Sequence, residues 1–284
     1  MSRGEVSSSL TEQVERLTAE SKARATAVSV HDLESGLRFS LRGDRWFHAA
    51  STIKVAVLLA LFRAVDEGRV RLDDSLHVRN RFFSAANGSP FQLNRDSDAM
   101  PELYQTIGQT AKVSALAEGM ISASSNLATN LLLDFVGVGY ARNVLRDAQV
   151  EGVELRRGVE DHAAYEKDIN NEATADGLMT LLSALRGNFL SSESKEQAIR
   201  ILLEQRFNSM IPAGVPPHAA VAHKTGEIST ACHDMGIVYL PEREPYIAVI
   251  LTEFDSEKEG RRETVAAISE AIYHSVIGMR GEIK

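Results

Sequence analysis

The sequence predicts an α+β fold, an α/β sandwich in which an antiparallel five-stranded sheet is flanked by helices and an all-helical lobe is inserted between its strands. Strand-like patterns occupy both ends of the 284-residue chain, and helical patterns fill its middle. An apolar fraction of 44% is enough to bury a sizeable core. We therefore expect a single domain over residues 1–284, with an α/β lobe at about 10–50 and 215–280 and a helical lobe at about 51–214.

The first elements are predicted to be a helix and a β-hairpin. Leu10, Val14 and Leu17 recur at helical spacing. Residues 26–32 then alternate in polarity, and the turn-forming residues 34–36 separate this strand from a second one. The hairpin supplies two strands of the sheet.

A buried helix is predicted to follow Ser51 and to end at Gly68. Its apolar residues, which fill nearly every face, are Ile53, Val55, Leu58, Leu59, Phe62 and Val65. The stretch 81–108 is rich in Asn, Ser, Asp, Gly and Pro and is predicted to be a long irregular loop. Loops of this length usually carry function, so we expect it to border the functional site, with Phe82 or Phe83 contacting a substrate or packing into the core.

The remaining elements change from helical to strand-like along the chain. Helices are predicted at 113–120, 125–135 and 175–185, the last between an N-cap at Thr174 and Gly187. Strands at 221–224, 235–240 and 246–254 and a closing helix at 264–277 follow. The last three strands complete the predicted sheet.

Composition excludes several function classes. The net charge of -8 and a pI near 5.6 provide no basic surface for nucleic acid. No stretch approaches the roughly 20 apolar residues of a membrane span. The single cysteine, Cys232, excludes an internal disulfide. The chain also lacks metal-binding and nucleotide-binding motifs, so we expect no metal and no cofactor. The oligomeric state stays open.

The compartment stays open at the level of the sequence. Residues 1–20 are polar and lack the apolar run of a secretory signal. As written, the chain is expected to be cytosolic or already processed.

Three short motifs point to acyl transfer. Ser51-Thr52-Ile53-Lys54 places a hydroxyl and an amine about one helical turn apart, which suits a nucleophile beside its base. This motif alone is weak, because Ser51 could be a helix N-cap and a second S-x-x-K occurs at 192–195. Ser124-Ser125-Asn126 opens a later helix, and Lys224-Thr225-Gly226 ends a strand. The three motifs in this order are far more specific than one.

With these motifs the chain resembles the class A β-lactamases and penicillin-binding proteins. The likeness extends to Met120-Ile121 before the second motif and to His223 before the third. Within this family, the chain resembles a branch of class A-like serine hydrolases that carry His-Lys-Thr-Gly and Gly-Val-Glu-Asp segments. The resemblance implies a β-lactamase/transpeptidase-like fold and a serine hydrolase that opens β-lactams through an acyl-enzyme.

The resemblance also implies roles for the motif residues. Ser51 is the nucleophile and Lys54 its base, since burial and the nearby charge of Lys224 favour a neutral amine. Ser124 passes a proton to the leaving nitrogen. Substrate is held by Asn126 at its amide and by Lys224 and Thr225 at its carboxylate. The backbone N–H groups of Ser51 and Glu227 stabilise the oxyanion, and Gly226 lets the substrate approach the strand.

A β-lactamase must also release the acyl group with a loop carboxylate, and Glu160 is the candidate. It lies in Arg157-Gly158-Val159-Glu160-Asp161. The loop departs from the family pattern because no Pro follows Glu160, and Ala164 stands where an Asn helps to hold water, although Asn170 or Asn171 can take its place. Alternatively, Glu160 or Asp161 pairs with Arg156 or Arg157 and only pins the loop.

Two further departures concern the second motif and the substrate carboxylate. Ser125 replaces the usual Asp, which is a mild change because that position mainly supports the neighbouring loop. His233 and Asp234 stand where many relatives place an arginine that binds the substrate carboxylate. Two other functions therefore stay open: a D-Ala-D-Ala peptidase or esterase, and a penicillin-binding sensor that is acylated without turnover.

Overall fold

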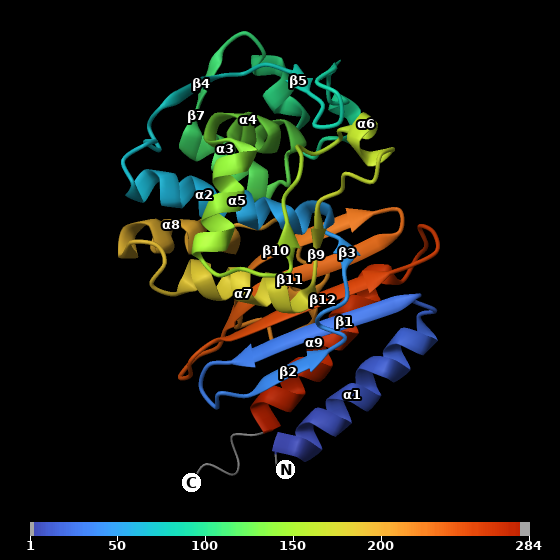
Figure 1. Ribbon diagram of the computed structural model, residues 1–284. Coiled ribbons are helices and arrows are strands. Elements are labelled where there is room, and N and C mark those ends of the chain that lie inside the picture. Colours follow the sequence, from blue (N-terminus) through green and yellow to red (C-terminus); the bar gives the residue numbers. More distant parts are fainter. Residues whose placement is uncertain (1–2, 279–284) are drawn as a thin grey trace.

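The computed structural model describes residues 3–278, and the outermost residues of the predicted domain, 1–2 and 279–284, lie outside the described part. The main sheet has the strand order β10-β11-β12-β1-β2, with every neighbouring pair antiparallel (Figure 1). Its strands are β1 (Ala25–Asp32), β2 (Arg38–Leu41), β10 (Ala220–Ile228), β11 (Ala231–Tyr239) and β12 (Tyr246–Glu253). The predicted antiparallel sheet, built from the first hairpin and the last three strands, is confirmed.

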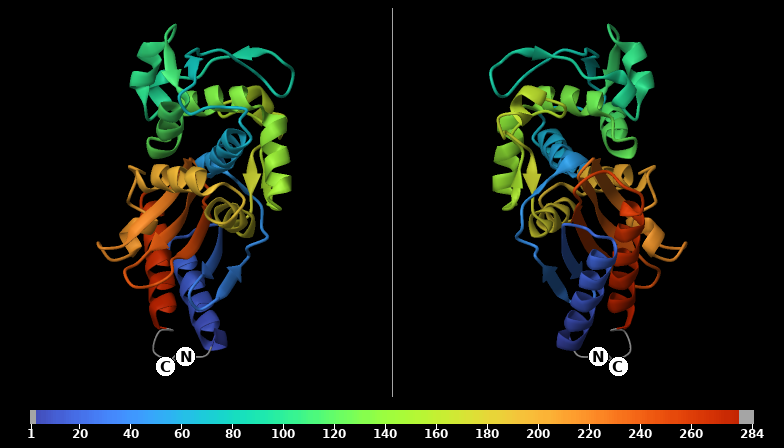
Figure 2. Two further views of the ribbon diagram at one scale, coloured as in Figure 1. Left: turned by 90° about the vertical axis from the view of Figure 1, so that its left-hand side faces the viewer. Right: turned by 90° about the vertical axis from the view of Figure 1, so that its right-hand side faces the viewer.

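Helices cover both faces of this sheet (Figure 2). On one face, α1 (Arg3–Glu20) and α9 (Arg261–Gly278) lie side by side. On the other face, α7 (Ala175–Arg186) packs on β1 and β12, and α8 (Ser192–Leu203) packs on β10. The inner strands β11 and β12 are therefore buried on both faces, which explains the nearly continuous apolar sequence of β12.

The helices above the sheet surround α2 (Lys54–Asp66), in which nearly every side chain is buried. It packs against α3 (Val113–Ser122), α4 (Asn126–Val136) and α5 (Val138–Asp147). Gly68 follows its end with a φ of +68°, a conformation that glycine adopts without strain. The division into an α/β lobe and a helical lobe stays a prediction. Helices α7 and α8 fall within the predicted helical lobe, and they pack on the sheet.

The stretch 81–108 is more ordered than the predicted irregular loop. It contains the hairpin of β5 (Phe82–Phe83) and β6 (Pro90–Phe91), followed by the 3-10 turns η2 (Arg95–Ser97) and η3 (Pro101–Thr106). Phe82 is buried against Phe91, whereas the Phe83 side chain is 64% exposed. Neither aromatic residue lines the cleft at Ser51. The core alternative is therefore correct for Phe82, and Phe83 is exposed outside the cleft.

Several short elements carried no periodic signal in the sequence, because two or three residues are too few to show one. β3 (Phe47–His48), β9 (Glu172–Ala173) and β8 (Val153–Glu154) form a small sheet, and β4 (Ser75–His77) pairs with β7 (Thr110–Lys112). A short helix, α6 (His162–Tyr165), follows Asp161, and the 3-10 turn η4 (Ile211–Gly214) precedes β10. Among residues 3–278, no helix combines the length and apolarity needed to cross a membrane.

Candidate active site

Ser51 lies in the 3-10 turn η1 (Ala50–Ile53), which leads directly into α2. The preceding residue, Ala50, has a φ of +47°, a conformation that a non-glycine residue keeps only where its surroundings hold it. Neither η1 nor α2 has a side-chain hydrogen bond at its N-cap, so the interpretation of Ser51 as a capping serine is wrong. Ser51 instead lines a cleft of about 410 Å³.

Gly226 allows β10 to pass close to this turn. A Cβ atom at position 226 would lie 3.1 Å from the backbone nitrogens of Ser51 and Thr52 and from the Thr52 Cγ2 atom. That spacing is tighter than an ordinary van der Waals contact. A side chain at this position would have to displace the turn of Ser51 by a few tenths of an ångström, so glycine favours the close approach of the strand to the nucleophile.

Two lysine amines meet on the hydroxyl of Ser124. Lys54 Nζ donates to Ser124 Oγ at 3.2 Å and to the Ser124 carbonyl oxygen at 2.6 Å, and Lys224 Nζ donates to Ser124 Oγ at 2.9 Å. Both lysines are completely buried. Ser124 itself has a φ of +58°, so its position also rests on strained backbone. The structure thus brings the first residues of the second and third motifs together with the lysine of the first.

Burial dominates the electrostatics of the two amines. It lowers the pKa of Lys54 to about 7, against the opposing effects of the Asp98 and Glu160 carboxylates. Burial also lowers the pKa of Lys224 well below its ordinary value, and the nearby Lys54 lowers it further. Because each positive charge disfavours the other, the site favours at least one neutral amine near neutral pH.

Asn126 connects Lys54 to Glu160. Its Oδ1 atom accepts a hydrogen bond from Lys54 Nζ at 2.7 Å, and its Nδ2 group donates to Glu160 Oε1 at 2.6 Å. Glu160 has a φ of +56° and also accepts hydrogen bonds from the Ser97 hydroxyl at 3.3 Å and the Asn94 backbone N–H at 3.4 Å. Through Asn126, the Glu160 carboxylate belongs to the same polar network as Lys54. Glu160 also lines the cleft.

Thr225 and Glu227 flank Gly226 on β10. Thr225 is nearly buried, and its carbonyl oxygen accepts a hydrogen bond from Lys224 Nζ at 2.8 Å. Glu227 lines the cleft, but its carboxylate is paired with Arg262 of α9 at 2.8 Å. The side chain of Glu227 is therefore occupied by a structural ion pair, which leaves its backbone N–H as the group relevant to an oxyanion.

The loop that carries Glu160 is pinned by contacts other than the predicted ion pairs. Arg157 donates to the carbonyl oxygens of Ile169 and Gly158 and to the Asn170 side chain, and Arg156 pairs with Glu172. Asp161 accepts from the backbone N–H groups of Ala85 and Ala164. The predicted pairing of Glu160 or Asp161 with Arg156 or Arg157 as the means of pinning this loop is therefore wrong, because these side chains bind other partners instead.

The two asparagines expected to replace the missing Asn at Ala164 are also committed to the loop. Asn171 Oδ1 accepts from the backbone N–H groups of Arg156 and Arg157, and its Nδ2 donates to the Arg157 carbonyl. Asn170 binds the Arg157 guanidinium. Asn171 does line the cleft, but its polar atoms already have partners.

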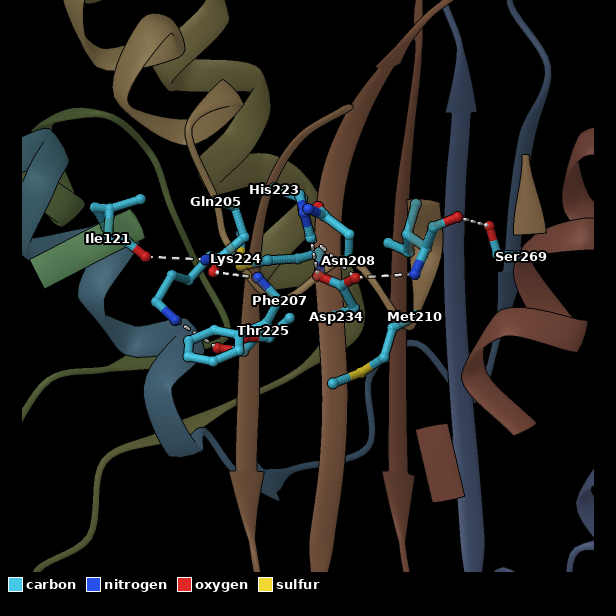
Figure 3. A network of polar contacts seen from close by, with 12 residues as sticks. Ile121, Gln205, Phe207, Asn208, Met210, His223, Lys224, Thr225, Asp234 and Ser269 are labelled. Atoms are coloured by element: carbon cyan, nitrogen blue, oxygen red, sulfur yellow. Dashed lines mark hydrogen bonds and ion pairs between the residues drawn. The ribbon is translucent and has the colours of Figure 1, made fainter. Parts of the chain in front are cut away.

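The sheet side of the site is supported by a buried pair of polar side chains, His223 and Asp234. His223 Nδ1 lies 3.0 Å from Asp234 Oδ1, and both side chains are almost completely buried. Asp234 also accepts from the Ile211 backbone N–H at 3.0 Å, and Ser269 of α9 donates to the Ile211 carbonyl (Figure 3). Asp234 is thus part of the support behind Lys224. Its carboxylate cannot bind a substrate carboxylate as an arginine at this position would.

His233 ties β11 to the segment that enters η1. Its Nδ1 atom accepts from the Thr252 backbone N–H, so Nε2 carries the proton and donates to the His48 carbonyl at 3.0 Å. Burial lowers the pKa of His233 to about 4, which keeps the ring neutral. Because His48 precedes Ser51 by three residues, this bond helps to place the nucleophile.

Sequence reasoning missed Asp98 and several cleft residues. Asp98 is buried in the stretch 81–108 and binds the start of α4. The cleft is also lined by His48, His162 and Tyr165. No motif or periodicity marked these positions, because their proximity to Ser51 depends on loops. Among residues 3–278 there is no cluster of three or more His, Cys, Asp or Glu side chains that could hold a metal ion.

Comparison with known proteins identifies the family. The model of the β-lactamase enzyme family matches residues 9–276. β-Lactamase ROB-1 of Haemophilus influenzae is 27% identical over 256 residues, covering 88% of this chain and 79% of that protein. The extended-spectrum β-lactamase PER-1 of Pseudomonas aeruginosa is 23% identical over 239 residues, covering 78% and 72%.

Solved structures agree with this match. A mutant of PBP-A, in an acyl-enzyme complex with penicillin G, has a TM-score of 0.80 and 26% identity, covering 95% of this chain and 96% of that one. An ancestral class A β-lactamase has a TM-score of 0.80 and 26% identity, covering 94% and 99%. The family model spans nearly the whole chain, and the structural matches confirm the predicted fold class. The chain belongs to the β-lactamase enzyme family.

Proposed function

We propose that this chain is a serine β-lactamase that opens the β-lactam amide through an acyl-enzyme on Ser51. The observation that supports this proposal most is the meeting of Lys54 and Lys224 on the Ser124 hydroxyl, next to the turn that carries Ser51. A serine hydroxyl needs a base to become a nucleophile, and a leaving nitrogen needs a proton. This site contains the Ser124 hydroxyl and two buried amines suited to both tasks.

In the acylation step, neutral Lys54 accepts the proton of Ser51 while the Ser51 oxygen attacks the β-lactam carbonyl carbon. The backbone N–H groups of Ser51 and Glu227 stabilise the oxyanion. When the carbon–nitrogen bond breaks, Ser124 donates its proton to the leaving nitrogen and recovers one from the Lys54 ammonium at 3.2 Å. The step ends with an ester on Ser51, a protonated nitrogen and Lys54 neutral again.

A β-lactam carboxylate would bind at Lys224 and Thr225, and the substrate amide at Asn126. Burial and Lys54 lower the pKa of Lys224, and a bound carboxylate would raise it again by stabilising the ammonium. Lys224 therefore gains its charge most readily when an anionic substrate is present. This gain contributes to recognition in a site whose neighbour Asp234 replaces the usual arginine.

Deacylation requires a water molecule activated by Glu160. Its carboxylate lies in the cleft, hydrogen-bonded to Asn126, which also binds Lys54. Water would lose a proton to Glu160 as its oxygen attacks the ester carbonyl carbon. When the bond from that carbon to the Ser51 oxygen breaks, Glu160 would return the proton to Ser51, which restores both groups. Ala164 and the committed amide of Asn171 provide no side-chain partner for that water, so we expect deacylation to be slower than acylation.

A D-Ala-D-Ala peptidase or esterase, or a sensor that stays acylated, would use the same acylating groups. The loop of Glu160 favours these alternatives, because Ala164 and the committed amide of Asn171 leave the deacylating water without a side-chain partner. The PBP-A structure held as an acyl-enzyme with penicillin G belongs to a protein similar to this one. The lifetime of the acyl-enzyme therefore separates the functions.

Intact mass spectrometry with benzylpenicillin, sampled from seconds to hours, measures that lifetime. We expect a transient adduct on the wild-type protein, no adduct on Ser51→Ala, and an adduct on Glu160→Gln that persists at least about 100-fold longer. A permanent wild-type adduct would select the sensor or the peptidase, and hydrolysis of an acyl-D-Ala-D-Ala peptide faster than of benzylpenicillin would select the peptidase. A folded protein that forms no adduct would exclude a β-lactam substrate.

A further inference from the structure

The second motif lacks its own acidic residue, and the structure provides a carboxylate at the same place from another part of the chain. Ser125 occupies the position of the usual Asp. Asp98, which follows η2, extends to the start of α4 and is only 6% exposed. Its Oδ2 atom accepts hydrogen bonds from the backbone N–H groups of Asn126 and Leu127, both at 2.9 Å. Asp98 thus supplies, from a distant part of the sequence, the carboxylate that is absent at position 125.

The remaining contacts of Asp98 hold its carboxylate in one orientation. Oδ2 lies 3.3 Å from the Ser125 hydroxyl and 3.2 Å from the Tyr104 hydroxyl, and Oδ1 accepts from the Met100 backbone N–H at 2.9 Å. Ser125 itself accepts from the Ala128 N–H, further along the first turn. The two side chains therefore divide the unpaired N–H groups of this turn between them. A negative charge at a helix N-terminus is also favoured by the helix dipole.

This first turn carries the catalytic groups of the helical side. Asn126 is the first residue of α4, and Ser124 lies two residues earlier in a left-handed conformation that needs external support. Both bind the Lys54 amine. A shift of the turn would move the proton carrier and the substrate-binding amide together, and displacements of about 1 Å can cost a 100-fold change in rate.

We propose that Asp98 is a positioning residue for the second motif, fixing Ser124 and Asn126 against Lys54 by binding the first backbone N–H groups of α4. The proposal rests on the proposed function of Ser51 and Lys54. It assigns a specific task to the stretch 81–108, which supports the start of α4 through this carboxylate.

Asp98 also has an electrostatic effect that a purely structural residue would lack. Its carboxylate raises the pKa of Lys54 and so opposes the effect of burial. Replacing it with a neutral side chain should lower the pKa of Lys54. Since only neutral Lys54 accepts the proton of Ser51, the acid limb of the acylation rate should move to lower pH in the variant.

The test compares Asp98→Asn with Asp96→Asn, an exposed carboxylate in the same segment. Acylation by benzylpenicillin is measured between pH 5 and pH 9 under single-turnover conditions. Asp98→Asn should reduce the plateau rate by about 10- to 100-fold and move the acid limb to lower pH. Asp96→Asn should change neither, and adding Ser125→Asp to Asp98→Asn should return the limb towards higher pH. A wild-type rate and limb in Asp98→Asn would overturn the proposal, and so would a reduced rate with an unmoved limb.

A readout that needs no substrate separates this test from the proposed function. The ionisation of Lys54 is followed by NMR of 13C-lysine-labelled protein, with the signal assigned through Lys54→Gln. A lower pKa for Lys54 in Asp98→Asn supports the proposal even if benzylpenicillin is not the substrate, and an unchanged pKa overturns it. If Asp98→Asn does not fold, the double variant Asp98→Ser with Ser125→Asp keeps one carboxylate at this turn. Acylation within tenfold of wild type then supports the proposal, and a folded protein with more than a 100-fold loss overturns it.

Discussion

The active site has two walls, one from the sheet and one from the helical side, and they are built in different ways. On the sheet side, Lys224, Thr225 and Gly226 lie within β10, which is paired with β11 from Ala220 to Ile228. On the helical side, Ser124, Asn126 and Glu160 lie at the ends of loops. Individual side chains hold them, chiefly Asp98 at α4 and Asn130, which bonds both backbone groups of Val159.

This contrast predicts which wall keeps its residues in place when a single supporting side chain is replaced. A backbone ladder sets the sheet wall through many hydrogen bonds, so one side-chain change there should cost stability before it costs geometry. The helical wall has fewer supports, and each is a side chain that a single substitution removes. We therefore expect substitutions on the helical wall to reduce rates, and substitutions behind the sheet wall to reduce the free energy of unfolding.

The greatest loss of rate is expected on the helical wall, at Lys54. Lys54→Gln should reduce the acylation rate constant by roughly 100- to 10,000-fold, the range lost with a general base. The free energy of unfolding should change by no more than about 1 kcal/mol, because the substitution removes a buried amine that burial already disfavours as a cation. Single-turnover acylation and urea unfolding measure the two quantities.

The second S-x-x-K motif provides the matched control for this prediction. Lys195→Gln in α8 should leave acylation unchanged. If Lys54→Gln retained more than a tenth of the wild-type rate, another group would be the base. The expectation that substitutions on the helical wall cause the largest losses of rate would then lose its main support.

A smaller effect, on stability, is expected behind the sheet wall at Asp234. Asp234→Asn should lower the free energy of unfolding by about 3 kcal/mol, because it breaks a buried pair with His223 and weakens the bonds to Ile211. The acylation rate per folded molecule should change by less than about tenfold. Chemical unfolding and active-site titration with benzylpenicillin supply both numbers.

Glu244→Gln, which removes a surface ion pair with Arg186, is the control and should cost less than about 1 kcal/mol. The comparison of the walls would be contradicted by an Asp234→Asn protein that unfolds like wild type but acylates more than about 100-fold slower. Such a result would mean that the sheet wall also depends on one side chain.

The mildest change we predict is the pH dependence of acylation. Because the pKa of Lys54 is about 7, its neutral fraction falls as the pH is lowered, and the acylation rate constant should fall roughly tenfold from pH 8 to pH 6. Lys224→Arg should lower the rate but keep an acid limb, since arginine does not titrate in this range. If the acid limb of the acylation rate disappeared in Lys224→Arg, the titrating group would be Lys224 on the sheet wall and not Lys54.

Much of the fold was predictable because long periodic segments dominate it. The hairpin of β1 and β2, the buried helix α2 and the last three strands are all present, with Thr174 as the N-cap of α7. The short strands β3, β8 and β9 were not predicted. The stretch 81–108 was wrongly predicted as irregular, since its structure depends on a hairpin of two-residue strands and on side-chain contacts with other loops.

The family and the residues that meet at Ser124 could be read from the sequence alone, because each motif is local and its side chains leave a helix or strand at a fixed spacing. The supports of these residues became apparent only in the folded chain. Asp98 reaches α4 from a stretch with no recognisable motif, and Asp234 is the buried partner of His223. Such contacts join residues far apart in the chain, and no local pattern of residue types encodes a distance of that kind.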